Sequence, residues 1–577
     1  VALLFGPAGH IGIEMPATIV PDRAGGLDHL YFEVVAAVTT FLLAGRYFET
    51  RAKEKAGTAL AALLRAGAKE ATVIGADGTH RTMPIDELRV GTRMYVRPGE
   101  TIPTDAVVEE GESAVDESLL TGEAMPVDKC AGDAVAGSTL NTSGTLTIRA
   151  TRIGTDTALA QIARLVREAQ HGQAPVQRLA DRISAWFVPA VGIVALVTLV
   201  GWLVAGEEPS FAFTCTVAVL IIACPCALGL ATPTALLVGT GRGAQLGLLI
   251  RGPQILEATH AVDTVVLDKT GTLTTGSMEV LEVLTAEGVS DGQALRLVGS
   301  AEQGSEHPIA KAIVRAAEAR IGQVPPPSMF VAHGGLGASA RVADRQVVVG
   351  RPSLLEDMGM RCPQSLAAAL VSAERKGHTA IAGGWYGEVR TVIVLADPPK
   401  RGAAEAVVRL RALGLHPVLL TGDNEHAAQR IAGEVGINAN DVIAGVLPEG
   451  KAEVVARLQA QGRVVAVVGD GINDAPALAR ADLGIAIGTG TDAAIQASDL
   501  TIVSGDPAGA ADAIALSRRT LRIIKQNLFW AFAYNVVLIP AAATGYLNPV
   551  LAGLAMAASS LLVVGNALRL RRFKPHG

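Results

Sequence analysis

The chain has few cysteines, few aromatic residues and little charge for its length. Of its 577 residues, five are cysteine, 4% are aromatic and 18% are charged, whereas 50% are hydrophobic. Five cysteines are too few to build a disulfide framework in a chain this long. The net charge of −6 gives no reason to expect a nucleic-acid partner. This composition is typical of a membrane protein with large soluble parts, and the length predicts several domains.

Charge is also missing from long apolar segments, which predict membrane spans. The stretch Asn527–Leu568 contains no charged residue and is long enough for two spans, with a turn at Gly545–Pro549. The uncharged segments Phe187–Gly206 and Phe211–Gly241 predict another pair of spans. The mostly apolar segment Leu30–Phe48, with Glu33 near one end and Arg46 near the other, predicts one more. Lysine and arginine gather at one end of these segments, which places that end in the cytoplasm. We therefore predict a multi-pass protein of the lipid bilayer, in a bacterial plasma membrane.

The beginning of the chain has neither a Met nor a basic leader nor a signal-peptide pattern. Val1–Phe5 is apolar and reads as the end of a membrane helix. We therefore expect the sequence to be a piece of a longer protein.

Two soluble regions are predicted between the apolar segments. A mostly β region extends from about Glu70 to Ile153, with short strand-like runs separated by turns. From about residue 260 to 510, apolar runs alternate with helical patterns, which predicts a doubly wound parallel sheet. Its predicted strands are Val262–Leu267, Val392–Leu395, Pro417–Leu420, Val464–Val468 and Leu483–Ile487. Residues from about 276 to 390 interrupt this order, and we interpret them as an inserted domain.

The five residues Asp268–Thr272 (Asp-Lys-Thr-Gly-Thr) directly follow the first of these strands. Ligands and reactive groups of open α/β sheets lie at the carboxyl ends of the strands. A carboxylate there can act as a nucleophile towards a phosphoryl group, although a single aspartate at a strand end more often caps a turn. The complete string is the phosphorylation signature of the P-type ATPases. Because it carries this signature, the chain resembles that family.

Two more loops follow apolar strands of the same predicted sheet and should meet Asp268 at its edge. They are Thr421-Gly422-Asp423 and Gly469–Asp474. Asp470 and Asp474 offer the hard oxygen ligands that suit Mg²⁺, with phosphate oxygens completing the coordination. Lys451 is suited to pair with the charge of a transferred phosphoryl group. The arrangement resembles a haloacid-dehalogenase-type phosphorylation domain, which also implies roles for Lys269 and Thr270 in catalysis.

Thr270 distinguishes a pump from a phosphatase. Soluble phosphatases of this superfamily usually carry a second aspartate there, as a general acid/base. Without it, an aspartyl phosphate at Asp268 should persist until another group directs water to it. Thr121-Gly122-Glu123 in the β region resembles the actuator loop of P-type ATPases, and the resemblance implies that Glu123 orients this water. An ordinary exposed loop acid is the alternative.

The inserted domain carries Ser305-Glu306-His307-Pro308. In the heavy-metal branch of the family, this histidine and an upstream glutamate face the adenine of ATP, and two glycines allow close approach of the nucleotide. The residues so implied here are Glu302, His307, Gly335 and Gly337. One position departs from the family pattern, because Arg351 stands where an asparagine is usual.

Cys224-Pro225-Cys226 lies in the middle of the predicted span Phe211–Gly241. Pro225 must kink or unwind the helix, and a bilayer tolerates this only where protein or a cavity receives the freed backbone groups. Thiolates on both sides of it are soft ligands that select Cu(I) or Zn²⁺ over Mg²⁺. Two core cysteines beside an incidental kink are the alternative. The string Cys224–Pro233 resembles the membrane metal site of the heavy-metal P-type ATPases.

The last predicted hairpin bears on which metal is bound. Its candidate ligands are Tyr534 and Asn535 on one helix and Met556 and Ser560 on the next. Met556 and Ser560 share a helical face. Thioether and thiolates without a carboxylate favour Cu(I). Zinc and cadmium members tend to place Lys and Asp in these helices, so the set here resembles that of copper(I) exporters, with ordinary helix packing as the alternative.

The resemblance covers essentially the whole chain. It implies a multidomain α-helical membrane protein with an α/β haloacid-dehalogenase-like phosphorylation domain, an inserted α+β nucleotide-binding domain and a small β-rich actuator domain. The expected segments are 1–60 (a stub and one span), 61–170 (actuator), 171–255 (two spans), 256–278 and 393–520 (phosphorylation), 279–392 (nucleotide binding) and 521–577 (two spans and a tail). The family normally has eight spans, so further helices are expected before Val1.

The implied function is ATP-driven export of Cu(I), or Ag(I), through an aspartyl phosphate, with Mg²⁺ as cofactor. A soluble copper carrier or thiol donor would deliver the metal. As a hypothesis, Glu49 and Asp181 receive Cu(I) and Glu33 helps to release it. Two alternatives stay open: a zinc or cadmium pump of the same family, and a non-transporting membrane-tethered phosphatase or metal sensor. Thr270 argues against the phosphatase.

Overall fold

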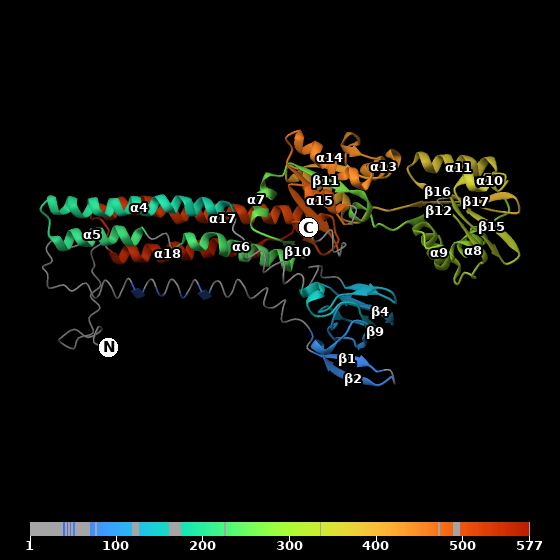
Figure 1. Ribbon diagram of the computed structural model, residues 1–577, viewed down its shortest axis with the longest axis horizontal. Helices are drawn as coiled ribbons and strands as arrows, with labels where there is room; N and C mark the ends of the chain where they lie inside the picture. Colours follow the sequence, from blue (N-terminus) through green and yellow to red (C-terminus); the bar gives the residue numbers. More distant parts are fainter. Residues whose placement is uncertain are drawn as a thin grey trace. The chain divides into compact units, whose positions relative to one another are not determined.

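The computed structural model describes residues 39–40, 43, 47, 50–51, 68, 70–75, 78–117, 126–160, 175–223, 227–334, 336–470, 474–488, 497–547 and 549–575. The chain divides into two units, Val1–His260 with Asp512–Gly577, and Ala261–Ala511. Figure 1 follows both along the sequence.

The first unit contains a small β domain. One sheet has the order β2-β1-β3-β9-β4-β7, with β1 (Glu70–Ile74), β2 (His80–Pro84), β3 (Arg93–Val96), β4 (Ala106–Glu110), β7 (Ala134–Val135) and β9 (Leu146–Ala150). A second has the order β6-β5-β8, with β5 (Ser113–Asp116), β6 (Val127–Lys129) and β8 (Leu140–Asn141). Leu146, Ile148 and Ala150 of β9 are all buried, because alternate residues of a strand face the same side.

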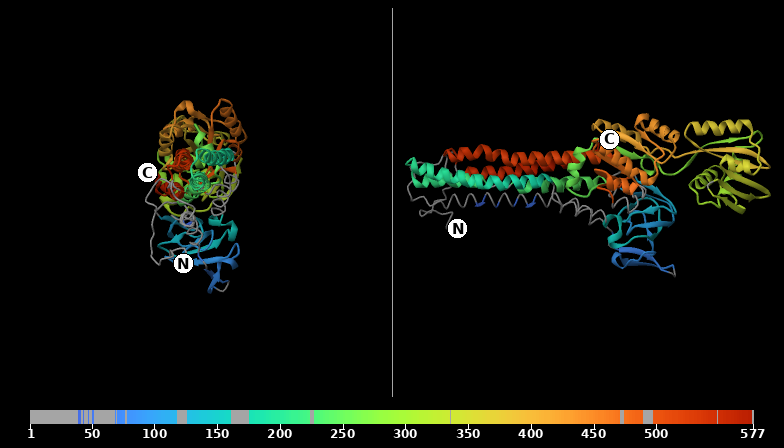
Figure 2. Two further views of the ribbon diagram at one scale, coloured as in Figure 1. Left: turned by 90° about the vertical axis from the view of Figure 1, so that its left-hand side faces the viewer. Right: turned by 45° about the horizontal axis from the view of Figure 1, so that its top comes forward.

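Long helices form the rest of the first unit and lie side by side (Figures 1 and 2). They are α4 (Pro175–Val204), α5 (Pro209–Ile222), α6 (Leu228–Gln245), α17 (Ala508–Ala543) and α18 (Pro549–Leu568), with the short α7 (Gln254–Ala261) and β10 (Leu248–Ile250). Val191, Ala218 and Val219 pack with Ile539 and Ala552 in their core.

Among the described residues, Arg182–Val204 and Pro549–Arg572 are long and apolar enough to cross a membrane, and Pro209–Ile222 is a shorter apolar helix. Large apolar side chains on these helices face outward, including Val197 and Leu562, which are 64% and 67% exposed. A patch of this kind needs an apolar surrounding, which lipid supplies.

The second unit contains a parallel sheet with the order β22-β21-β20-β11-β18-β19. Its strands are β11 (Thr264–Asp268), β18 (His416–Leu420), β19 (Val442–Ile443), β20 (Val465–Gly469), β21 (Leu483–Ile487) and β22 (Leu500–Ile502). Its helices are α12 (Ala403–Ala412), α13 (Glu425–Val435), α14 (Pro448–Ala460) and α15 (Ala475–Arg480). All residues of β11, β20 and β21 are buried, as expected for parallel strands covered on both faces.

The inserted region folds around an antiparallel sheet with the order β12-β17-β16-β15-β14-β13. Its strands are β12 (Glu279–Thr285), β13 (Ser328–His333), β14 (Gly337–Val342), β15 (Arg345–Gly350), β16 (Thr379–Trp385) and β17 (Glu388–Ala396). Helices α8 (Asp291–Glu302) and α9 (Pro308–Ile321) cover one face, and α10 (Pro352–Asp357) and α11 (Gln364–Arg375) cover the other (Figure 1).

The sheet predicted for one strand is wrong. Val392–Leu395 was expected in the parallel sheet, but it lies in β17 and pairs antiparallel with β12 and β16. Helices on both faces of this sheet bury the last six residues of β17, Thr391–Ala396. An antiparallel strand buried on both faces lacks the usual alternation and cannot be told from a parallel one by its pattern.

Candidate functional site

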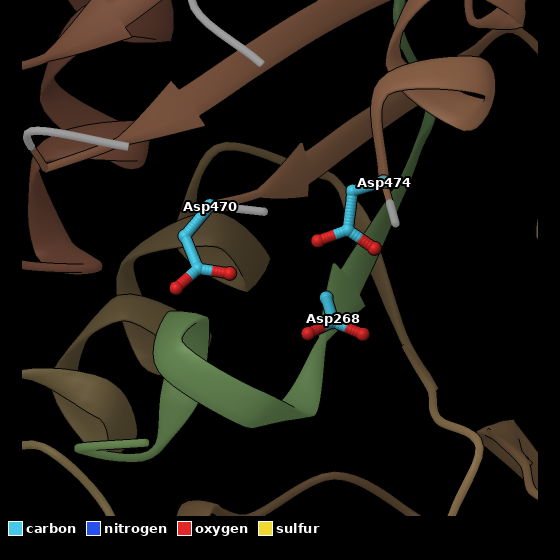
Figure 3. A group of neighbouring side chains, drawn as sticks. All are labelled: Asp268, Asp470 and Asp474. Atoms are coloured by element: carbon cyan, nitrogen blue, oxygen red, sulfur yellow. The ribbon is translucent and has the colours of Figure 1, made fainter. Parts of the chain in front are cut away.

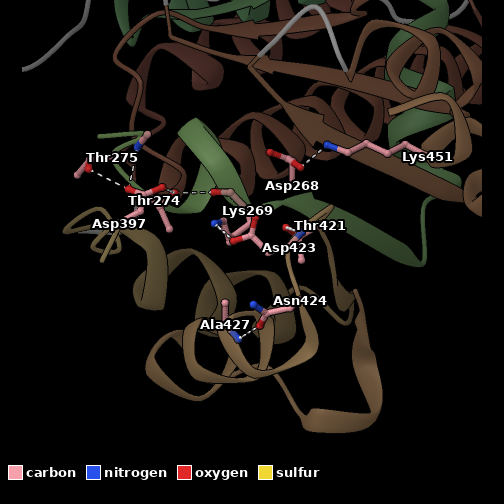
Figure 4. Close-up of polar contacts among 11 residues, drawn as sticks. Asp268, Lys269, Thr274, Thr275, Asp397, Thr421, Asp423, Asn424, Ala427 and Lys451 are labelled. Atoms are coloured by element: carbon pink, nitrogen blue, oxygen red, sulfur yellow. Dashed lines mark hydrogen bonds and ion pairs between the residues drawn. The ribbon is translucent and has the colours of Figure 1, made fainter. Parts of the chain in front are cut away.

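Three loops meet at the carboxyl edge of the parallel sheet. Strand β11 ends at Asp268 and pairs with β18 on one side and β20 on the other. Strand β18 leads into Thr421–Asp423, and β20 leads into Asp470. The structure therefore brings together these predicted residues: Asp268, Lys269, Thr421, Asp423, Lys451, Asp470 and Asp474 (Figures 3 and 4).

Asp268, Asp470 and Asp474 form a cluster of carboxylates. Each offers an oxygen that lies within 4.8 Å of the other two (Figure 3). Gly271 makes room for Asp470, because a Cβ at position 271 would lie 1.8 Å from Asp470 Oδ2 and the backbone there has φ +74°. Three carboxylates at a sheet edge are the hard oxygen donors that Mg²⁺ takes, so these residues fit a magnesium ion.

Lys451 in α14 ties two of these carboxylates together. Its Nζ lies 2.5 Å from Asp268 Oδ1 and 2.7 Å from Asp474 Oδ1. Lys451, Asp268 and Asp474 are all buried. A buried cation between two buried carboxylates balances part of their charge, and it also stands where a phosphoryl group on Asp268 would carry its own.

The site retains an excess of negative charge. Burial, together with the nearby Asp474, raises the pKa of Asp268 to about 7, although Lys451 acts in the opposite direction. Burial likewise raises the pKa of Asp470. Such carboxyls hold their protons more tightly than usual until a cation neutralises them, which is a further reason to expect a divalent ion here.

Lys269 forms an ion pair with Asp423 and is therefore turned towards the loop that follows β18 (Figure 4). The backbone N–H of Asp423 donates to Thr421 Oγ1 at 3.1 Å, which shapes this loop. The next residue, Asn424, caps α13 by accepting from the Ala427 N–H at 2.9 Å. Thr270 has an extended backbone and an exposed side chain.

Asp397 belongs to this region but was missed from the sequence. Its carboxylate accepts hydrogen bonds from Thr274 Oγ1 at 2.6 Å and Thr275 Oγ1 at 3.1 Å (Figure 4). It therefore ties the segment that leaves β11 to the segment that returns from β17. The signal that could have found it is its position two residues after the apolar run Val392–Leu395, at the end of an apolar segment like Asp268.

Two predicted nucleotide-binding residues lie at helix ends. Glu302 is the last residue of α8, and burial raises its pKa to about 7. His307 is exposed and caps α9, with its Nδ1 accepting from the Ile309 N–H at 3.3 Å. The cap gives His307 a structural role of its own, so its contact with ATP stays a prediction.

Gly337 has a packing reason to be glycine. A Cβ there would lie 2.1 Å from the carbonyl oxygen of Val349, and φ is +148°. The glycine thus allows β14 and β15 to approach, and its contact with ATP also stays a prediction. Other predicted positions lie outside the described residues or side chains: Gly335, Glu123, Cys224, Cys226, Glu33, Glu49 and the side chain of Asp181.

The residues that flank the Cys-Pro-Cys sequence pack against α17. Ala223 belongs to a buried cluster with Tyr534, and Ala227 belongs to another with Ala531 and Val563. Ala223 and Ala227 thus pack against the helices that carry the other predicted metal ligands.

The predicted ligands on these helices are largely buried. Asn535 is fully buried, and its Oδ1 has no hydrogen-bond partner among the described residues. Tyr534 is half-buried, Met556 is 4% exposed, and Ser560 is half-buried. A buried amide oxygen without a partner costs free energy, so it is available to a ligand.

Sequence profiles match two parts of the chain. The profile of haloacid dehalogenase-like hydrolases matches residues 262–482, and that of the P-type ATPase actuator domain matches residues 66–167. The chain is 54% identical over 554 residues to a probable copper-exporting P-type ATPase of Mycobacterium tuberculosis, covering 96% of this chain and 71% of the relative. It is 49% identical to a copper-exporting P-type ATPase of Staphylococcus haemolyticus, covering 96% and 69%.

A solved structure is similar over most of the chain. A zinc-transporting PIB-type ATPase in its E2.Pi state is 34% identical, with a TM-score of 0.63 over 93% of this chain and 87% of the other. Together with these matches, the parallel sheet, its edge of carboxylates and the β domain define a membrane-embedded ATP-hydrolysing enzyme with a haloacid-dehalogenase-like domain. The chain belongs to the P-type ATPases, in their PIB branch. The predicted family and fold class are thereby confirmed.

Proposed function

We propose that the protein exports Cu(I), and Ag(I) with it, across the bacterial plasma membrane at the expense of ATP. The observation that carries the choice of metal is the pair α17 and α18, where Asn535 and Met556 are buried, Tyr534 is half-buried, and no charged residue occurs between Asn527 and Leu568. Soft sulfur ligands without carboxylate favour Cu(I). The similar proteins named as copper exporters support the same choice.

Phosphoryl transfer would start at Asp268. A carboxylate oxygen of Asp268 attacks the γ-phosphorus of ATP, the bond to the bridging oxygen breaks, and ADP leaves. Lys451, 2.5 Å from Asp268, then lies next to the new phosphoryl group and stabilises its charge. Mg²⁺, held by Asp470 with Asp268 and Asp474, would neutralise charge on the phosphate oxygens when bound.

The phosphoenzyme would be hydrolysed by a separate group. Thr270 offers no carboxylate, so water must be activated from elsewhere, and Glu123 is the proposed base. Glu123 takes a proton from water, the water oxygen attacks phosphorus, and phosphate leaves with the carboxylate of Asp268 restored. ATP would be held by the inserted domain, through Glu302 and His307, with Gly335 and Gly337 lining the approach.

The metal would travel through the membrane helices. Cu(I) would pass from a soluble carrier or thiol donor to Cys224 and Cys226, with Met556 and Asn535 completing the pocket. Glu49 and Asp181 would receive Cu(I) as it enters the membrane helices, and Glu33 would help to release it on the other side.

Phosphoenzyme formation in the full-length protein tests this function. Labelling from ATP should require Cu(I) or Ag(I), should not respond to Zn²⁺ or Cd²⁺, and should disappear in Asp268→Asn. Cys224→Ser should lose Cu(I)-dependent labelling from ATP but keep labelling from inorganic phosphate. Stimulation by Zn²⁺ without stimulation by Cu(I) would show that the protein exports zinc rather than copper. ATP-independent phosphatase activity would contradict the proposal that it is a pump.

A further inference from the structure

Lys400 makes contacts that the proposed reaction has not used. It is the residue where the chain returns from the inserted domain, two positions after Pro398. Its backbone N–H donates to the Leu273 carbonyl at 2.8 Å, which aligns it with the end of the signature. Its Nζ donates to the Gly271 carbonyl at 2.5 Å and to the Gly505 carbonyl at 3.0 Å. The ammonium of this half-buried lysine thus donates hydrogen bonds to two backbone carbonyls.

The Gly271 carbonyl belongs to the peptide that admits Asp470. The Cα of Gly271 faces Asp470 so closely that no Cβ fits between them, and φ is +74°. Figure 3 shows Asp470 beside the turn that follows Asp268. The Cα and the carbonyl group of Gly271 lie in one rigid peptide plane, so a displacement of this peptide moves both. Holding the carbonyl therefore also preserves the space for Asp470.

The second carbonyl gives Lys400 an anchor outside the signature. Gly505 precedes Asp506, which caps the start of α17 by accepting from the Ala508 N–H at 2.9 Å. Asp506 also packs so tightly on Gly402 that a Cβ there would lie 1.9 Å from its Oδ1. The segment around Gly505 is therefore held on its own, and a bond to it fixes the position of the ammonium.

The surroundings of Lys400 are acidic. Burial lowers the pKa of Lys400, while the carboxylates of Asp470, Asp506 and Asp397 act in the opposite direction. Within the described part of the chain, the ammonium hydrogen-bonds to the two carbonyls and not to these carboxylates. Hydrogen-bond geometry rather than an ion pair is what connects Lys400 to the turn.

We propose that Lys400 is a positioning residue, which holds the Gly271 carbonyl so that Asp470 stays within reach of Asp268 and Asp474 as one divalent-cation site. This inference rests on the proposed function, since it concerns the same carboxylates. Residues that orient the ligands of a metal typically change its affinity by about 10- to 100-fold when they are removed.

Lys400→Met tests the proposal, because it keeps the length and apolar stem of the side chain and removes only the donor. Binding of Mn²⁺, standing in for Mg²⁺, is measured by EPR on the full-length protein with beryllium fluoride in place of the phosphoryl group. Mn²⁺ binding at the proposed site is defined as the fraction of the total binding that Asp470→Asn abolishes. We expect Lys400→Met to weaken it about tenfold or more, Lys400→Arg to restore most of it, and Arg401→Ala, which removes an exposed neighbouring cation, to leave it unchanged.

The direction of the change separates positioning from simple electrostatics. Loss of a positive charge near a metal site should strengthen Mn²⁺ binding if the charge alone matters, whereas loss of a positioning bond should weaken it. Unchanged or stronger binding in Lys400→Met would overturn the proposal, as would an equal loss in Arg401→Ala. Failure of the proposed function is seen separately, as a wild-type protein that forms no phosphoenzyme on Asp268.

Discussion

The ammonium of Lys451 lies 2.5 Å from Asp268 Oδ1 and 2.7 Å from Asp474 Oδ1, although the three residues are far apart in the sequence. The contact joins α14 to the end of β11 and to the start of α15. It places one cation where the proposed nucleophile Asp268, the neighbouring carboxylate of Asp474 and an incoming phosphoryl group would otherwise repel one another. The central site therefore depends on charge balance as much as on the nucleophile itself.

Removal of this cation should impair phosphoryl transfer. We expect Lys451→Met to lower the rate of phosphoenzyme formation by about 100-fold or more, since a preorganised cation at developing charge contributes that much. Rapid-quench labelling with ATP measures the rate, and Lys451→Arg should recover part of it. A normal rate in Lys451→Met would show that Lys451 only stabilises the fold.

Insertion of the missing acid should shorten the life of the phosphoenzyme. Thr270 is exposed and extended, so Thr270→Asp has no backbone cost. An acid/base carboxylate beside the nucleophile contributes about 100-fold or more to hydrolysis. Decay of the label in a Glu123→Gln background should therefore be faster with Thr270→Asp, while the matched variant Thr270→Asn stays slow. Equal decay of the two would show that Thr270 does not decide between pump and phosphatase.

The buried Glu302 predicts a pH-dependent stability of the inserted domain. Its pKa is about 7 in the fold against an ordinary 4.5, so the folded domain binds the proton more tightly than the unfolded chain. The contribution of Glu302 to the free energy of unfolding is fully present below about pH 4.5 and is lost as the pH rises through about 7. At pH 8 the loss amounts to at most about 3 kcal/mol. Glu302→Gln should remove this dependence.

Hydrogen exchange of α8 in the intact protein measures the effect. Protection in the wild type should fall between pH 5 and pH 8 after correction for intrinsic exchange, and Glu302→Gln should hold it level. If Glu302 also contacts adenine, the same variant should bind ATP more weakly while being more stable. Identical pH profiles would contradict the assignment of a buried, easily protonated carboxyl.

The buried Asn535 predicts a metal-specific effect in the membrane helices. Asn535→Leu removes an amide oxygen that has no hydrogen-bond partner among the described residues, and one long bond of 3.3 Å from its Nδ2 to the Ala531 carbonyl, so the cost to the fold should be small. Cu(I) affinity should nevertheless fall by about tenfold or more if the oxygen serves the metal. Competition with a Cu(I) chelator measures it, and Thr544→Ala, at an exposed position beyond the end of α17, is the control. Unchanged affinity would exclude Asn535 from the pocket.

Several features followed from local sequence. Uncharged segments predicted membrane helices, because a charge in lipid is costly whatever the fold around it. Asp268 and Asp470 could be placed at one edge because each follows an apolar run, and parallel strands put their carboxyl ends together. The prediction that Thr270 separates a pump from a phosphatase likewise rests on one position within the signature and needs no tertiary contact.

Other features depended on which segments meet in space. Val392–Leu395 is as apolar as Val464–Val468, yet it pairs antiparallel, since burial on both faces removes the pattern that would separate the two cases. Asp397 and Lys400 act through Thr274 and the Gly271 carbonyl, partners more than a hundred residues away. Backbone carbonyls leave no mark in a sequence, so a lysine that binds them looks like any other.

The sequence by itself therefore supplied the candidates: the proposed nucleophile, the candidate ligands and the predicted membrane segments, all of which depend on residue type and nearest neighbours. Only the tertiary structure decided that Lys451 lies between Asp268 and Asp474, that Lys269 pairs with Asp423, and that Gly271 must lack a Cβ because Asp470 occupies its place. Hydrogen bonds and ion pairs act over a few ångströms, and the distances between residues remote in sequence are set by sheet pairing and helix packing.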